Sequence, residues 1–120
     1  MVKKKSKMIV YEKPTCSTCR AVLGILKDKH VTFETINYYE KPFTASVLKK
    51  MISKLGFKPR ELLRTKEPIY KKLRLGDKKF SYEEIIGFMI KYPDLMQRPI
   101  VVRGNKVILA RPVEKINAVI

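Results

Sequence analysis

The chain has 120 residues, a net charge of +16 and 45% hydrophobic residues. This length and composition predict one globular domain that can bury its own core, and they argue against a disordered chain. No apolar run approaches the roughly 18 residues of a membrane span, and the run after the basic start, MIVY, is too short for a signal peptide. We therefore expect a cytoplasmic protein with no membrane partner, in a compartment where thiols stay reduced.

The positive charge is spread along the chain rather than gathered in one basic arm. Lysine pairs occur at 49–50, 71–72 and 78–79, and the start, MVKKKSK, predicts a flexible basic tail over residues 1–7. Such a surface attracts anions, which include small oxyanions, nucleic acids and acidic proteins. A solvated, lysine-rich surface explains most of these charges equally well, so charge alone does not predict a nucleic-acid binder.

The first third of the chain predicts a β-α-β unit. Met8–Tyr11 is a short apolar run typical of a buried strand, and apolar residues at helical spacing predict a helix over residues 17–30. Val31–Asn37 is rich in β-branched and aromatic residues and predicts a second strand. The crossover between the two strands is expected to be right-handed.

The middle of the chain, roughly residues 43–96, is predicted to be helical. Thr44 can cap a helix that Gly56 closes, and Ser81 forms a capping box with Glu84 three residues later. The segments PRELLR and EPIYKKL each predict a short helix, the first with Pro59 at its first position. This helical block separates two β regions.

The end of the chain predicts a β-hairpin and a last short helix. Two strand-like runs, RPIVV and KVILA, flank Gly104 and Asn105, which are typical of a two-residue turn. Residues 113–119 can pack back on the sheet as a helix. The whole order predicts an α/β fold, a thioredoxin-like mixed sheet with an inserted helical segment, in a single domain over residues 1–120.

Both cysteines lie at the turn between the first strand and the first helix, in YEKPTCSTCR. Backbone N–H groups of the first helical turn would point at Cys16 and lower the pKa of its thiol. Cys19 lies one turn further along, within disulfide reach of Cys16, as a redox partner or as an inert core residue. A zinc site normally needs four ligands, and with His30 as the one histidine we expect no metal.

Two arginines are predicted to face each other across the hairpin. With the Gly-Asn pair in the turn, counting back along both strands places Arg98 opposite Arg111. Like charges so placed are destabilising unless an anion lies between them, and arginine offers forked donors that match an oxyanion. The alternative is that both side chains extend into solvent. In a thioredoxin-like fold the position of Pro99 would also place Arg98 near Cys16, and the sequence is compatible with either isomer of that peptide bond.

The motifs YEKPTCSTCR, PRELLRTKEPIY, RPIVV and ARPVE, in this order and spacing, resemble the ArsC family of glutaredoxin-linked arsenate reductases over about residues 8–120. The resemblance implies an oxidoreductase that reduces arsenate to arsenite through a cysteine–arsenic adduct, with Cys16 as the nucleophile. It implies oxyanion binding by Arg64, Arg98 and Arg111, although by composition Arg64 is an ordinary surface arginine. It also implies no bound cofactor and an external thiol reductant, either glutathione with glutaredoxin or thioredoxin.

Two positions depart from the best-known members of that family. These members have serine where this chain has Cys19, so Cys19 could act as the resolving thiol and leave a Cys16–Cys19 disulfide for thioredoxin to reduce. They also have histidine where this chain has Glu12. An acidic side chain there would not stabilise a Cys16 thiolate. The helix dipole and the arginines would then have to suffice, unless Glu12 points away.

The fold and the Cys-x-x-Cys turn are also similar to Spx-like regulators, which bind RNA polymerase and sense disulfide stress. Such a regulator would use the cysteine pair as a switch. Spx-like proteins resemble this chain at RPIVV but lack the arginine of ARP, here Arg111, which an oxyanion site needs and a switch does not. The sequence therefore favours the reductase, with RNA polymerase as a partner only under the alternative. A general disulfide oxidoreductase would leave the three arginines unexplained.

Overall fold

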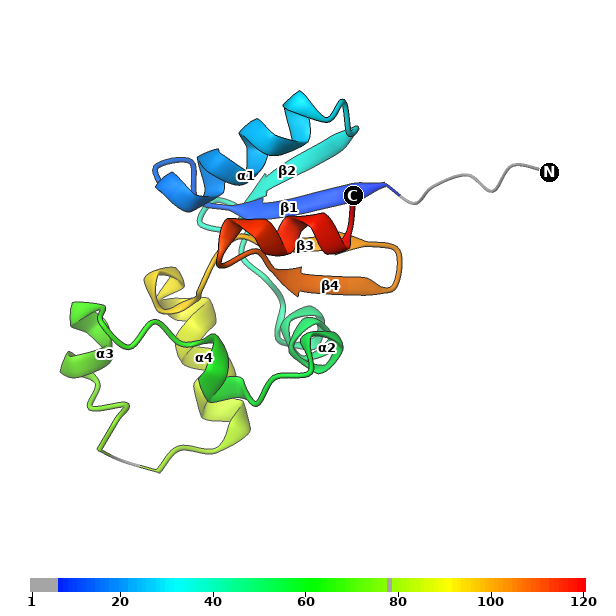
Figure 1. Cartoon of the computed structure of the whole chain (residues 1–120). Helices are drawn as coiled ribbons and strands as arrows, with labels where there is room; N and C mark the ends of the chain where they lie inside the picture. The colour runs from blue at the N-terminus through cyan, green and yellow to red at the C-terminus, as the bar shows by residue number, and fades with distance from the viewer. Residues whose placement is uncertain (1–6, 78) are drawn as a thin grey trace. The chain divides into compact units, whose positions relative to one another are not determined.

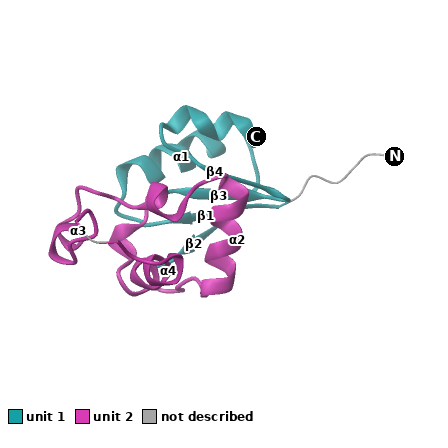
Figure 2. Ribbon diagram, turned by 90° about the horizontal axis from the view of Figure 1, so that it is seen from below, with its two compact units in different colours: residues 1–38, 98–120 teal, residues 39–97 magenta. Residues whose placement is uncertain are grey.

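The computed structural model describes residues 7–77 and 79–120. Apart from Lys7, the predicted basic tail lies outside the described residues. The chain forms two compact units (Figure 2), one from residues 1–38 and 98–120 and the other from residues 39–97. The first unit contains the predicted β-α-β unit and the hairpin, and the second contains the helical segment. The assignment of the whole chain to a single domain stays a prediction.

The first unit is built on a four-stranded mixed sheet with the strand order β2-β1-β3-β4 (Figure 1). β1 (Met8–Glu12) pairs in parallel with β2 (Phe33–Asn37), as a β-α-β unit requires. β1 also pairs with β3 (Ile100–Arg103), and β3 with β4 (Lys106–Leu109), both in antiparallel orientation. The sheet confirms the predicted thioredoxin-like mixed sheet of an α/β fold.

The hairpin between β3 and β4 has the predicted register. Arg103 pairs with Lys106 and Val101 pairs with Ile108, so the turn consists of two residues. Gly104 in that turn has a φ of +62°, in the left-handed region that glycine adopts without steric cost. The hairpin therefore presents the residues before β3 and after β4 side by side.

One face of this sheet is covered by α1 (Ser17–Asp28) and η3 (Val113–Ala118), which contact each other. Their shared core joins side chains from both strands and helices: Met8, Val10, Val22, Leu26, Val101, Ala110, Ile116 and Val119. Burial of this apolar surface fixes α1 on the sheet, with its first turn next to the carboxyl end of β1.

The end of the first predicted helix and the type of the last one differ from the structure. The first helix was expected to reach residue 30 but ends at Asp28, and His30 has a φ of +55°, which an α-helix cannot continue. The C-terminal helix is a short 3-10 helix, in which Val119 N–H donates to the Ile116 carbonyl three residues earlier.

The second unit has five short helices in its described residues, 39–77 and 79–97. In chain order they are α2 (Ala45–Leu55), η1 (Pro59–Leu62), α3 (Pro68–Lys72), α4 (Tyr82–Lys91) and η2 (Pro93–Leu95). η1 and η2 are 3-10 helices, and η1 begins at its proline as predicted. No helix in the described part of the chain is long and apolar enough to cross a membrane.

The predicted caps of the second unit are present. Thr44 Oγ1 accepts a hydrogen bond from Val47 N–H at 3.2 Å, and Gly56 ends α2 with a φ of +73°. Ser81 and Glu84 form the reciprocal capping box at the start of α4. These local contacts explain why both helices begin where the sequence indicates.

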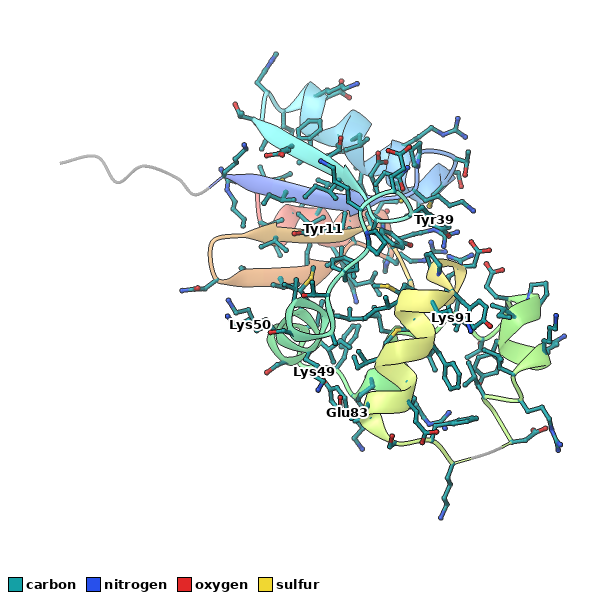
Figure 3. The ribbon with its side chains drawn as sticks, turned by 180° about the vertical axis from the view of Figure 1, so that it is seen from behind. Tyr11, Tyr39, Lys49, Lys50, Glu83 and Lys91 are labelled. Atoms are coloured by element: carbon teal, nitrogen blue, oxygen red, sulfur yellow. The ribbon has the colours of Figure 1, made fainter. Side chains whose placement is uncertain are left out.

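α2 and α4 pack against each other through apolar faces. The buried side chains on these faces are Leu48, Met51, Ile52, Ile85, Ile86 and Met89. At the exposed edge, Lys49 Nζ and Glu83 Oε2 lie 2.5 Å apart (Figure 3). Such an exposed ion pair contributes little stability, so the apolar contact holds the pair of helices together.

Candidate active site

Cys16 lies at the junction of β1 and α1, where the backbone aims hydrogen-bond donors at its sulfur. Its own N–H donates to the Lys13 carbonyl at 2.9 Å, which closes the turn after β1. Cys16 is the N-cap of α1, and its Sγ accepts a hydrogen bond from Cys19 N–H at 3.4 Å. The helix N-terminus carries a partial positive charge that favours an anionic sulfur at this position.

Opposing effects set the pKa of the Cys16 thiol. Burial alone would raise it. Hydrogen bonds from the side chain and the backbone N–H of Cys19, together with the charge and hydrogen bond of Arg98, outweigh burial and lower the pKa below its ordinary value. Cys16 is therefore the thiol that is more readily ionised.

Cys19 is in the opposite state. Its side chain is fully buried, and burial is the main cause that raises its pKa to about 12. A hydrogen bond with the Lys13 backbone opposes this effect, whereas the neighbouring Cys16 sulfur and the Glu12 charge add to it. Both cysteines are free thiols. The site therefore combines a sulfur that ionises readily with a neighbour that keeps its proton.

Arg98 and Arg111 are brought together as the register predicts. Ala110 N–H donates to the Pro99 carbonyl at 3.0 Å, which continues the pairing beyond the strands. One guanidinium nitrogen of Arg111 lies 3.3 Å from the Arg98 carbonyl and 3.3 Å from Thr18 Oγ1 in the first turn of α1. The Arg98–Pro99 and Arg111–Pro112 peptide bonds are both cis.

The surroundings of Arg98 connect it to the cysteines. Only 6% of Arg98 is exposed, and its guanidinium hydrogen-bonds to the Cys16 side chain. Neither arginine splays freely into solvent, because Arg98 is buried and Arg111 is hydrogen-bonded to α1. Two guanidiniums and a helix N-terminus thus surround a reactive thiol, which suits the binding of a small oxyanion.

Arg64 belongs to the second unit. Its N–H donates to the Leu95 carbonyl at 2.7 Å, and its Nε lies 3.0 Å from Glu67 Oε1. The neighbouring bridge between Leu63 and Met96 fixes this segment further. The part of Arg64 in oxyanion binding stays a prediction.

Three further residues belong to the environment of the cysteines. Tyr38 is buried directly after β2, and it interacts with Arg98 and with both sulfurs. Thr18 holds Arg111, and Glu12 at the end of β1 acts electrostatically on Cys19. The sequence motifs single out Glu12 but not Tyr38 or Thr18, since a tyrosine after a strand and a threonine in a helix are common.

A metal site is a separate question. In residues 7–77 and 79–120, no three His, Cys, Asp or Glu side chains cluster in a way that could hold a metal ion.

The chemistry that the site itself can perform is nucleophilic attack by a thiolate on a bound anion, followed by attack of a second thiol.

Comparisons with known proteins agree with this arrangement. The model of the ArsC family matches residues 11–119. An arsenate reductase of Neisseria meningitidis is 32% identical over 112 residues, which cover 92% of this chain and 96% of that protein. An uncharacterized protein of Escherichia coli, YfgD, is 41% identical over 108 residues, which cover 89% of this chain and 91% of that protein.

A solved structure of an arsenate reductase from Vibrio cholerae has the same fold. It superimposes with a TM-score of 0.91 at 30% sequence identity, and the match covers 98% of this chain and 100% of that one. The family match spans the cysteine turn, the helical segment and the hairpin with its two arginines. The chain therefore belongs to the ArsC family.

Proposed function

We propose that the protein is an oxidoreductase that reduces arsenate to arsenite in the cytoplasm, with Cys16 as the nucleophile. The grouping of the Cys16 thiol with Arg98 and Arg111 at a helix N-terminus carries this proposal. Arsenate reductases among the relatives support arsenate as the oxyanion. Arg111 favours an enzyme over an Spx-like regulator, which needs no anion site.

In the first step the Cys16 thiolate attacks the arsenic(V) of bound arsenate. A sulfur–arsenic bond forms, an arsenic–oxygen bond breaks, and the departing hydroxide takes a proton and leaves as water. Arg98 and Arg111, joined by Arg64 as the family resemblance implies, hold the charged oxygens. The oxidation state of arsenic does not change in this step.

In the second step Cys19 resolves the adduct. Its thiolate attacks the Cys16 sulfur, a disulfide forms, and the sulfur–arsenic bond breaks. The electron pair of that bond stays on arsenic, which leaves as arsenite in the +3 state. The spacing of the two cysteines supports this role, and thioredoxin or glutaredoxin then reduces the Cys16–Cys19 disulfide.

NADPH consumption tests this proposal. Reduced protein is mixed with arsenate and either thioredoxin with its reductase, or glutathione with glutaredoxin and glutathione reductase. We expect arsenate-dependent turnover in wild type, none in Cys16→Ser, and loss of the thioredoxin-coupled rate in Cys19→Ser. Phosphate, which has the same shape but is not reduced, should inhibit competitively without consuming NADPH.

The outcomes separate the two roles. No arsenate-dependent turnover with either reductant, in protein whose Cys16 still alkylates readily, contradicts the proposed activity. Full thioredoxin-coupled turnover in Cys19→Ser contradicts the resolving role of Cys19 alone.

A further inference from the structure

A buried carboxylate lies near Cys19 and has no part in the steps above. Glu12 is the last residue of β1 and only 7% of it is exposed. Its Oε2 has no hydrogen-bond partner among the residues that the structure describes. Burying a carboxylate without compensating hydrogen bonds costs free energy, so a use for this group is worth seeking.

The fold brings Glu12 to the face of the sheet that α1 covers. Side chains alternate along a strand, so Glu12 is on the same face as Met8 and Val10, which pack against Val22 of α1. Cys19 lies one turn before Val22 on the same side of the helix and is fully buried. The Glu12 carboxylate and the Cys19 thiol therefore share the layer between strand and helix, and Glu12 acts electrostatically on Cys19.

The acid–base properties of the neighbouring groups single out Glu12. Cys19 holds its proton at neutral pH because burial, above all, raises its pKa to about 12, so it needs a base before it can attack. Three other groups around the cysteines cannot serve as this base. Arg98 is a cation, and Cys16 carries the adduct at this stage. Tyr38 is a buried phenol whose pKa is raised to about 12, so it is protonated at neutral pH. Burial raises the pKa of Glu12, which makes its carboxylate a stronger base.

We propose that Glu12 is the proton acceptor that activates Cys19 for the resolving step. The inference rests on the proposed function only in taking Cys19 as the resolving thiol. The Cys19 S–H bond breaks, an O–H bond forms on Glu12, and the Cys19 thiolate attacks the Cys16 sulfur. A disulfide forms, the bond from Cys16 to its adduct breaks, and the departing group takes the electron pair and then the proton. The two thiol sulfurs are oxidised and the departing group is reduced.

A chromogenic disulfide, dithiobis(nitrobenzoate), tests this step without arsenate. Attack by Cys16 releases one coloured nitrobenzoate thiolate and leaves the other on Cys16, and attack by Cys19 releases the second. In Glu12→Gln we expect the first phase to stay close to the wild-type rate and the second to slow by roughly a hundredfold at neutral pH. The deficit should shrink at alkaline pH, where hydroxide deprotonates Cys19 directly.

The matched control is Glu114→Gln, which makes the same change at an exposed carboxylate of η3. Both phases should keep their wild-type rates in this variant. Equal second-phase rates in Glu12→Gln and wild type overturn the inference. A second phase that persists in Cys19→Ser also overturns it, because Cys19 would then not be the resolving thiol.

The wild-type protein provides a second measurement in case Glu12→Gln does not fold. With Glu12 as the base, the second phase should gain rate with pH in the acidic range and level off once the carboxyl is ionised. A rate that instead climbs about tenfold per pH unit through the neutral and alkaline range overturns the inference, since hydroxide would then be the base.

The two proposals fail separately. If wild type shows no arsenate turnover but its second phase depends on Glu12, the proposed function is wrong and the role of Glu12 stands. If arsenate turnover persists while the rate of the second phase is the same in Glu12→Gln and wild type, only the role of Glu12 is wrong.

Discussion

At the scale of single residues, the two cysteines differ in pKa although they lie three positions apart. Burial raises the pKa of both, but Cys16 also receives hydrogen bonds from Cys19 and the charge of Arg98, which lower its pKa. Cys19 has the Cys16 sulfur and Glu12 as neighbours, which add to the effect of burial. The first sulfur is suited to attack, and the second keeps its proton until the adduct has formed.

Replacing Arg98 should therefore raise the pKa of Cys16. In Arg98→Gln the guanidinium charge and its hydrogen bond to the thiolate are lost, so the rate of alkylation by iodoacetamide should reach its midpoint at a higher pH than in wild type. At neutral pH, Cys16 should consequently react more slowly. The measurement is the alkylation rate against pH in Cys19→Ser backgrounds, where Cys16 is the one thiol.

Arg20→Gln is the control for this prediction, because Arg20 is an exposed arginine of the same helix. With Arg20→Gln added to Cys19→Ser, the midpoint pH of Cys16 alkylation should stay close to that of Cys19→Ser alone. An Arg98→Gln midpoint equal to or below that of the parent would mean that Arg98 does not stabilise the Cys16 thiolate.

At the scale of elements, α1 connects the cysteines to the hairpin. Val22 and Leu26 pack the helix on the sheet, while Thr18 in its first turn contacts the guanidinium of Arg111. Arg111 also reaches the carbonyl of Arg98. The helix therefore positions a second guanidinium as well as the nucleophile, and a change in its first turn should affect anion binding.

Thr18→Val tests this coupling, because it removes the hydroxyl while nearly keeping the shape of the side chain. With the 3.3 Å contact to Arg111 lost, we expect the KM for arsenate to rise about fivefold with kcat little changed, the equivalent of one hydrogen bond of about 1 kcal/mol. Bound arsenate should protect Cys16 from alkylation. The arsenate concentration that gives half-maximal protection therefore compares arsenate binding in the two proteins without turnover.

Thr15→Val makes the same substitution at an exposed position in the turn before Cys16. Its KM should remain near that of wild type. If Thr15→Val and Thr18→Val weaken arsenate binding equally, the Thr18 hydroxyl has no specific effect on Arg111.

At the scale of the whole molecule, stability should depend on pH through buried groups whose pKa is raised by folding. Folding raises the pKa of Cys19 to about 12, whereas an unfolded cysteine titrates near about 8.5. Between these values the folded protein binds more protons than the unfolded chain, so the free energy of unfolding falls as pH rises. Tyr38, whose pKa burial also raises to about 12, adds to the fall above about pH 10.

Denaturant unfolding at several pH values between about 7 and 10 measures this effect. One group with a raised pKa lowers the free energy of unfolding by at most about 1.4 kcal/mol per pH unit. Cys19→Ala should be less stable at neutral pH, because it leaves a small cavity, but its stability should fall less steeply above about pH 9. Deprotonation of lysines relieves the repulsion of the +16 charge equally in both proteins, so it does not contribute to the difference in slope. Identical slopes would contradict the raised pKa of Cys19.

Features that depend on residues a few positions apart can be predicted from the sequence alone. The caps at Thr44 and Ser81, the two-residue turn and the facing of Arg98 and Arg111 follow from local hydrogen bonds and from a register counted outward from that turn. The end of the first helix was placed two residues too late, because helical periodicity does not reveal where the backbone of His30 turns to positive φ.

The surroundings of the cysteines depend on tertiary packing and cannot be predicted from the sequence. That Tyr38 and Arg98 are buried beside Cys16, and that Glu12 shares a layer with Cys19, depends on α1 packing on a sheet whose strands come from both ends of the chain. The sequence shows that an acidic residue at position 12 would not stabilise a Cys16 thiolate, but it does not show where the Glu12 side chain points. Burial and through-space charge arise between residues distant in the chain. Together with the local hydrogen bonds between the two cysteines, they set the pKa values on which the chemistry depends.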